Sequence, residues 1–119
     1  GIIIKENHLR SGKSLEDIVK EANASMPKGA LVELEVENLA ELERGLAAGA
    51  RRIMLDDFSL EDMRAAVALT GDRADLEASG GVNLSTIKAI AETGVDYISC
   101  GSITKHVKAL DLSMLFDYR

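Results

Sequence analysis

The chain has 119 residues and a formal net charge of −6, and 46% of its residues are apolar while 29% are charged. This length bounds it to a single domain, residues 1–119, with a composition typical of globular proteins. The acidic balance argues against nucleic acid or an anionic membrane as a partner, and no apolar run approaches the length of a membrane span. Because Cys100 is the lone cysteine and no export signal is recognisable, we expect a cytoplasmic protein without disulfides.

Strand and helix patterns alternate along the first half of the chain. The β-branched run at residues 2–5 predicts a strand buried on both faces. A polar loop leads to a helix that Ser14 caps and that Pro27 ends. Strict alternation at residues 31–37 predicts a second strand, and Asn38 can cap the helix after it. This order indicates consecutive βα units.

The second half continues the same alternation, with three further strands predicted at residues 53–56, 74–79 and 97–100. Ser59 can cap the helix after the first of these strands. The next helix, with Leu84 on its apolar face, is expected to start directly after a glycine loop. We expect residues 104–119 to form mostly short helix packed on the outside.

Several features recur with a period of 45 residues. Ser14 and Ser59 are separated by this distance, as are Gly49 and Gly94. One period holds two βα units, which predicts a parallel sheet with right-handed crossovers. Two architectures fit this pattern. One is about half of a TIM-like (βα) barrel, since a whole barrel needs about 250 residues; the other is a five-stranded flavodoxin-like doubly wound sheet. Because the chain enters its first strand at once, without an initiator methionine, we expect it to be part of a longer protein.

Carboxylates gather near the ends of the middle strands. Glu33, Glu35 and Glu37 share one face of their strand, and Asp56 ends the next strand at the corresponding level. One interpretation is a solvated face of an edge strand. In a parallel sheet covered by helices, however, these side chains would point into a barrel or cleft, where they need cations. Candidate cations are Lys5, Lys105 (after the fifth strand) and a bound Mg²⁺.

Two small-residue turns follow the last two strands. Ser79, Gly80 and Gly81 end one strand, and Gly101 follows the other. Glycines let backbone N–H groups approach an anion closely, and paired loops of this kind form the phosphate sites of (βα) barrels. The alternative is that the glycines only close turns. We interpret Cys100 as a small packing residue, since no activating histidine is apparent.

Six segments of the sequence carry a resemblance to a known family: IKENH at 4–8, ELEVENL at 33–39, MLDDF at 54–58, LEASGGVNL at 76–84, ETGVDYIS at 92–99 and, after Gly101, LDLSM at 110–114. In this order they closely resemble quinolinate phosphoribosyltransferase, also called carboxylating nicotinate-nucleotide pyrophosphorylase. The resemblance runs nearly from end to end. Asp57 departs from it, because asparagine is usual there.

The resemblance implies the roles of eight residues. Lys5 resembles the lysine that meets a quinolinate carboxylate, and Glu35 and Asp56 resemble the acids that hold the ribose hydroxyls and the Mg²⁺-bound pyrophosphate. These three are the expected catalytic residues, and Glu35 and Asp56 are also the expected contacts to the metal. The expected phosphate-binding residues are Ser79, Gly80, Gly101, Lys105 and its neighbour His106.

The resemblance also implies an activity and partners. The family makes nicotinate mononucleotide, pyrophosphate and CO₂ from quinolinate and phosphoribosyl pyrophosphate with Mg²⁺, in de novo NAD synthesis. It works as a dimer or larger assembly, so we expect a homo-oligomer or a complementing chain. The family's N-terminal domain, first barrel strands and quinolinate-gripping basic cluster would precede Gly1, and the isolated chain is therefore expected to be inactive. The alternative is a non-catalytic half-barrel or flavodoxin-like module that binds at most phosphate.

Overall fold

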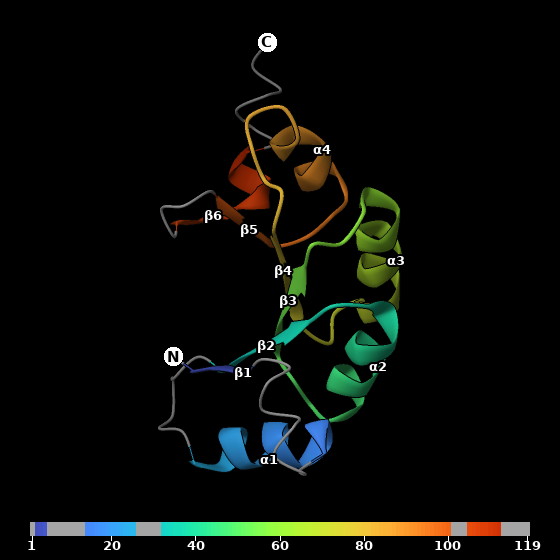
Figure 1. Cartoon of the computed structure of the whole chain (residues 1–119), viewed down its shortest axis with the longest axis vertical. Helices are drawn as coiled ribbons and strands as arrows, with labels where there is room; N and C mark the ends of the chain where they lie inside the picture. Colours follow the sequence, from blue (N-terminus) through green and yellow to red (C-terminus); the bar gives the residue numbers. More distant parts are fainter. Residues whose placement is uncertain (1, 5–13, 26–31, 101–104, 113–119) are drawn as a thin grey trace.

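The computed structural model describes residues 2–4, 14–25, 32–100 and 105–112 (Figure 1). Its elements in chain order are β1 (Ile2–Ile4), α1 (Leu15–Ser25), β2 (Val32–Val36), α2 (Leu39–Ala47), β3 (Arg52–Asp56), α3 (Leu60–Thr70), β4 (Asp75–Ser79), α4 (Ile87–Glu92), β5 (Tyr97–Cys100) and β6 (Lys105–Lys108). None of the described helices is both long enough and apolar enough to cross a membrane.

Within the described residues, six strands form one sheet in the order β1-β2-β3-β4-β5-β6. The first five are parallel, and β6 is antiparallel to β5. Figure 1 shows the sheet curving as an arc with the helices along its outer side. Strands that neighbour one another in sequence order, with helices on one face, are the arrangement of a (βα) barrel. The partial-barrel prediction is therefore confirmed, and the doubly wound alternative, which needs helices on both faces, is wrong.

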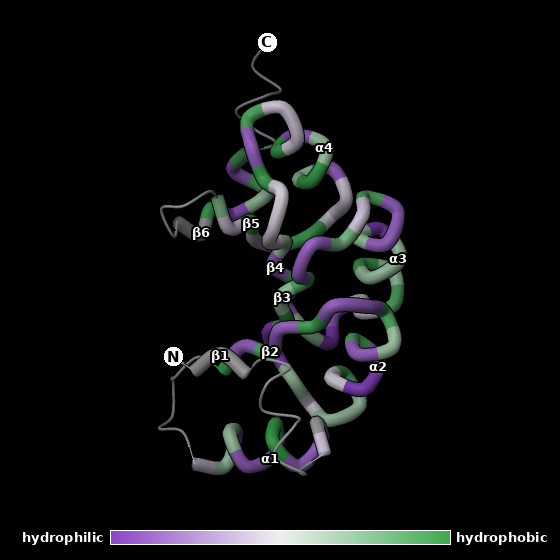
Figure 2. The backbone as a smooth tube through the Cα atoms, in the orientation of Figure 1, coloured by the Kyte–Doolittle hydropathy of each residue, from purple (hydrophilic) through white to green (hydrophobic). Residues whose placement is uncertain are grey.

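The core lies between the strands and the outer helices. One set of alternate strand residues faces the helices and is at most 2% exposed, namely Leu34, Val36, Ile53, Leu55, Leu76, Ala78 and Ile98. Figure 2 shows both green, apolar and purple, polar stretches along the turns of α2 and α3, as expected of helices that pack on the sheet with one face. Leu42 and Met63 complete the core from α2 and α3. The remaining strand residues consequently project toward the concave side of the arc.

The predicted helix caps are present. The Ser14 hydroxyl accepts a hydrogen bond from the Asp17 backbone N–H at 3.1 Å, and Ser59 accepts one from Asp62 at the same distance. Asn38 caps α2 by accepting from the Glu41 N–H at 2.9 Å. These bonds satisfy N–H groups that have no partner inside the helix.

The glycines of the repeat also have equivalent conformations. Gly49 and Gly94 follow α2 and α4 with φ values of +90° and +99°. This left-handed region ends a helix at little cost only for glycine. The 45-residue period is thus a structural repeat of two βα units.

The prediction of a mostly helical tail is wrong for residues 105–108. These residues form β6 and pair with all of β5, with Tyr97 opposite Lys108 and Cys100 opposite Lys105. The pairing satisfies the free edge of β5, which local helix propensity does not take into account. Residues 109–112 are helical as expected, and residues 113–119 lie outside the described residues.

Candidate functional site

The register of the parallel strands brings the predicted acids and the first glycine loop to one edge of the sheet. Asp56 and Ser79 are direct partners at the carboxyl ends of β3 and β4. Two residues before Asp56 on the same face of β3, Met54 lies between Glu35 on β2 and Glu77 on β4. Sites of (βα) barrels are built at this edge. Glu35, Asp56 and Ser79 therefore lie on the same side and at the same end of the sheet.

The acidic strand is an interior strand, so the interpretation as a solvated edge is wrong. β2 lies between β1 and β3, and Glu33 is only 3% exposed. Glu35 is half-buried on the same face. Glu37, however, lies beyond the end of β2, and its backbone N–H donates to the Glu41 carboxylate at 2.9 Å. Two of the three expected glutamates thus project from β2 to the concave side.

The loops after β3 and β4 are in contact. The Asp57 N–H donates to the Ser79 carbonyl at 2.8 Å, and Asp57 has a positive φ of 58°. Gly80 has a φ of +85°, and a Cβ there would lie 3.1 Å from the Asp57 backbone nitrogen. Gly81 also has a positive φ, of 63°. Glycine is required at Gly80 by both conformation and the close approach of the neighbouring loop.

The expectation that a helix starts directly after these glycines is wrong. Residues 84–86 form a turn, and α4 begins only at Ile87. The Asn83 side chain accepts hydrogen bonds from the backbone N–H groups of Ser85 and Thr86 at 2.9 and 3.2 Å. Such local bonds offer the backbone an alternative to a helix. Leu84, expected on the apolar face of that helix, is 93% exposed.

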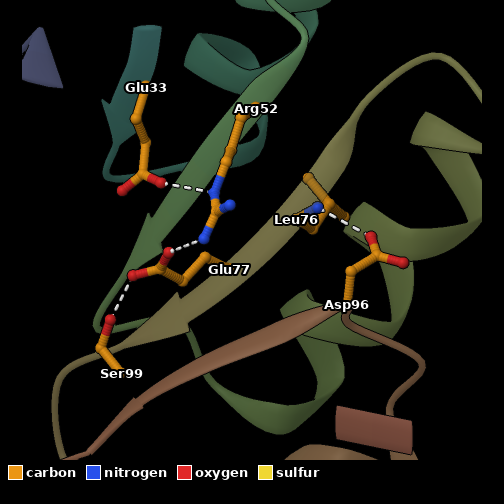
Figure 3. Close-up of polar contacts among 6 residues, drawn as sticks. All are labelled: Glu33, Arg52, Leu76, Glu77, Asp96 and Ser99. Atoms are coloured by element: carbon orange, nitrogen blue, oxygen red, sulfur yellow. Dashed lines mark hydrogen bonds and ion pairs between the residues drawn. The ribbon is translucent and has the colours of Figure 1, made fainter. Parts of the chain in front are cut away.

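Arg52 is a cation on the acidic face, bound to two of its glutamates. Its Nε donates to Glu33 at 2.8 Å and its Nη2 donates to Glu77 at 2.8 Å, so one guanidinium joins β2 and β4 across β3 (Figure 3). The guanidinium carbon also lies 4.1 Å from the centre of the Tyr97 ring. Glu77 in turn accepts a hydrogen bond from the Ser99 hydroxyl. We call Glu33, Arg52, Glu77, Tyr97 and Ser99 the concave-face network.

The charges of this network are only partly balanced. Burial, and then the negative charge of Glu77, raises the pKa of Glu33 to about 7. Burial by itself would lower the pKa of Arg52, but its bonds to Glu77 and Glu33 outweigh that effect and leave the pKa raised. Two carboxylates against one guanidinium leave one negative charge in excess, and Glu33 is a group that can take up the proton.

Sequence reasoning missed Arg52, because the third strand was expected to start one residue later, at Ile53. The alternation of side chains along a strand could have identified it, because Arg52 lies two and four residues before Met54 and Asp56 and therefore shares their face.

The other predicted site residues are Lys5, Gly101, Lys105 and His106. Lys5 and Gly101 lie outside the described residues. Lys105 and His106 belong to β6, where His106 is the register partner of Ser99. Among the described residues, no three or more His, Cys, Asp or Glu side chains gather as a metal site would require. The roles of Lys5, Gly101, Lys105 and His106 in binding a ligand stay predictions.

An arc of parallel βα units with its polar groups at the carboxyl ends of the strands is the architecture of (βα)-barrel enzymes. The family model described as "Quinolinate phosphoribosyl transferase, C-terminal domain" matches residues 1–115. The chain belongs to this family.

Known members support the assignment. A probable nicotinate-nucleotide pyrophosphorylase [carboxylating] of Bacillus subtilis is 39% identical over 114 residues, which are 96% of this chain and 39% of that protein. The solved structure of the nicotinate-nucleotide pyrophosphorylase from Francisella tularensis is 45% identical, with a TM-score of 0.80 over 91% of this chain and 38% of that one. A mandelate oxidase structure with 16% identity and a TM-score of 0.59 shares the fold alone. The chain thus spans about two fifths of the length of its relatives.

Proposed function

We propose that this chain supplies the ribose-phosphate half of the active site of a quinolinate phosphoribosyltransferase. The reaction would convert quinolinate and phosphoribosyl pyrophosphate to nicotinate mononucleotide, pyrophosphate and CO₂. The observation that carries the proposal is the register that pairs Asp56 with Ser79, one residue before the Gly80 turn. It brings an acid suited to a ribose hydroxyl next to a loop suited to a phosphate, in a chain of the right family.

The residues fit the chemistry of this transfer. Departure of pyrophosphate leaves positive charge on the ribose ring, and carboxylates fixed beside it stabilise that charge. Glu35 and Asp56 are proposed for this role, because they lie at the same edge on adjacent strands. Backbone N–H groups of the Ser79–Gly80 loop are proposed to bind the 5′-phosphate.

A divalent cation fits the donor set, although the described residues alone do not surround one. Asp56 offers hard oxygen ligands that suit Mg²⁺, and such an ion usually takes its other ligands from water and the substrate's phosphates. When bound, Mg²⁺ would neutralise the charge developing on pyrophosphate. We therefore propose that Glu35 and Asp56 contact the ion mainly through the pyrophosphate.

Further groups are needed to complete the site. Lys5 is proposed to meet a carboxylate of quinolinate, and Gly101, Lys105 and His106 to border the 5′-phosphate. The chain's resemblance to its family supports these roles. We propose that a second copy or a complementing chain completes the barrel and the quinolinate pocket, and that the protein acts in the cytoplasm.

Binding measurements on the 119-residue chain test the proposal. Isothermal titration with phosphoribosyl pyrophosphate and Mg²⁺ should show binding that Asp56→Asn weakens by about tenfold or more, since a charged acceptor becomes a neutral one. Asp72→Asn is the matched control, because Asp72 is exposed in the turn after α3. A wild-type chain without measurable binding, or equal affinities for the two variants, would refute the proposal. It would favour a module that does not bind this substrate.

Turnover requires the rest of the site. The isolated chain is expected to form no measurable nicotinate mononucleotide. A chimera in which this chain replaces the matched segment of the Bacillus subtilis relative should form it, and Asp56→Asn should reduce that rate. Turnover by the isolated chain near that of the intact relative would contradict the proposed division of the site.

A further inference from the structure

Glu77 has both carboxylate oxygens committed within the concave-face network. Its side chain is fully buried, its Oε1 accepts from Arg52 Nη2 at 2.8 Å, and its Oε2 accepts from the Ser99 hydroxyl (Figure 3). A buried carboxylate bound on both oxygens has little freedom to turn. Glu77 therefore fixes the direction of the Ser99 O–H bond.

The Arg52 side chain is also fixed in position by several contacts. The Nε of Arg52 donates to Glu33 at 2.8 Å, and its guanidinium lies over the Tyr97 ring at 4.1 Å. The planar, delocalised group can make these contacts together, whereas the single ammonium of a lysine cannot span both carboxylates. The orientation of the Ser99 hydroxyl thus depends, through Glu77, on Arg52.

Ser99 lies beside the candidate phosphate loop. Ala78 pairs with Ile98 in the parallel register of β4 and β5, and Ser79 and Ser99 are the next residues along these two strands. Ser99 is half-buried and on the concave side, as its contact with Glu77 shows. It therefore belongs to the same level as Asp56, the register partner of Ser79 on the other side.

The direction of the hydroxyl decides what it can bind. A serine hydroxyl has one proton and two lone pairs, and the Ser99 proton is donated to Glu77. The oxygen can then offer only lone pairs to a ligand, so its partner must be a hydrogen-bond donor. An ionised phosphate oxygen is an acceptor and does not fit, whereas a sugar hydroxyl does.

We propose that Ser99 is a further binding residue of the site, which accepts a hydrogen bond from a ribose hydroxyl, and that Arg52 is its positioning residue, acting through Glu77. The proposal rests on the proposed function in so far as the ligand is a ribose phosphate. It adds a sugar contact on β5 to a site whose other proposed contacts on β4 are to phosphate.

The test compares three ligands with the 119-residue chain: ribose 5-phosphate, its 2-deoxy analogue and inorganic phosphate, each titrated by NMR at the amide of Gly80. Ser99→Ala should weaken binding of ribose 5-phosphate by about three- to tenfold, as expected for one neutral hydrogen bond, and leave that of inorganic phosphate unchanged. Ser99→Thr, which keeps the hydroxyl, should restore the affinity. Arg52→Lys should weaken ribose 5-phosphate binding in the same way as Ser99→Ala.

The controls separate this inference from the function on which it rests. Ser25→Ala changes an exposed hydroxyl at the end of α1 and should have no effect. The 2-deoxy analogue identifies the sugar hydroxyl. If its affinity for the wild-type chain equals the affinity of ribose 5-phosphate for Ser99→Ala, the 2-hydroxyl is the group that donates to Ser99. Equal loss for inorganic phosphate, or no change in any ligand, overturns the role of Ser99 while leaving the phosphate site intact. Absence of all ribose 5-phosphate binding by the wild-type chain overturns both.

Discussion

Replacing Glu33 with glutamine is expected to remove a pH dependence from the stability of this protein. Glu33 is 3% exposed, and burial, with the charge of Glu77, raises its pKa from 4.5 to about 7. The folded chain therefore binds a proton at Glu33 more tightly than the unfolded chain does. The resulting stability is fully present below the unfolded pKa of 4.5 and is lost as the pH rises through about 7.

The size of the effect follows from the two pKa values. At roughly 1.4 kcal/mol per pKa unit, their difference corresponds to about 3 kcal/mol of unfolding free energy. Glutamine resembles the protonated glutamate in size and charge, so Glu33→Gln should match wild type at about pH 4 and exceed its stability by up to ~3 kcal/mol at about pH 8. Arg52 keeps Glu77 as a partner, so no guanidinium is left unpaired.

Urea unfolding at a series of pH values measures this difference. The chain has no tryptophan, so far-ultraviolet circular dichroism is the appropriate signal. Glu43→Gln, at an exposed position of α2, is the matched control and should track wild type at every pH. The reasoning is refuted if Glu33→Gln also tracks wild type throughout, or if the variant is the less stable protein at alkaline pH.

Two further substitutions test the local structure. Asn38→Ala should cost about 1 kcal/mol in thermal or urea unfolding, because the Glu41 N–H loses its cap; an unchanged stability would show that the cap contributes nothing. Gly80→Ala should lower the free energy of unfolding by about 1–2 kcal/mol because of the positive φ, and by a further amount because the new Cβ would approach Asp57. Gly49→Ala should show only the cost of its positive φ, because a Cβ there would have nothing within 4 Å. Equal losses at the two glycines would contradict the close loop contact.

The elements and most of their starts could be predicted because their determinants are local. Alternation in residues 31–37 placed Leu34 and Val36 against the helices, and the structure agrees. The caps at Ser14 and Ser59 also depend on residues only three positions away. Local competition explains the failure at α4, where the Asn83 turn delays the helix to Ile87. The prediction of helix at residues 105–108 failed for a different reason: these residues form β6, whose partner is the edge of β5.

The candidate site was predictable in its residue types and only partly in its arrangement. Glu35, Asp56 and Ser79 were expected at one edge of the sheet, and the register brings them there. From the sequence, we expect Lys5 or Lys105 to balance these acids; Lys5 lies outside the described residues, and Lys105 is the first residue of β6. Arg52 fills that role from the middle of the sheet. A cation's partners lie on other strands, so strand order and register must be known before they can be identified.

By itself the sequence determined the family, the βα repeat and the faces of the alternating residues in β2, because periodicity and capping act over a few residues. Only the tertiary structure decided that the strands follow one another in an arc, that Arg52 joins Glu33 to Glu77, and that Ser99 donates its proton to Glu77. These contacts link residues 19 to 25 positions apart. Their geometry follows from sheet register and burial, which arise only when the whole sheet is assembled.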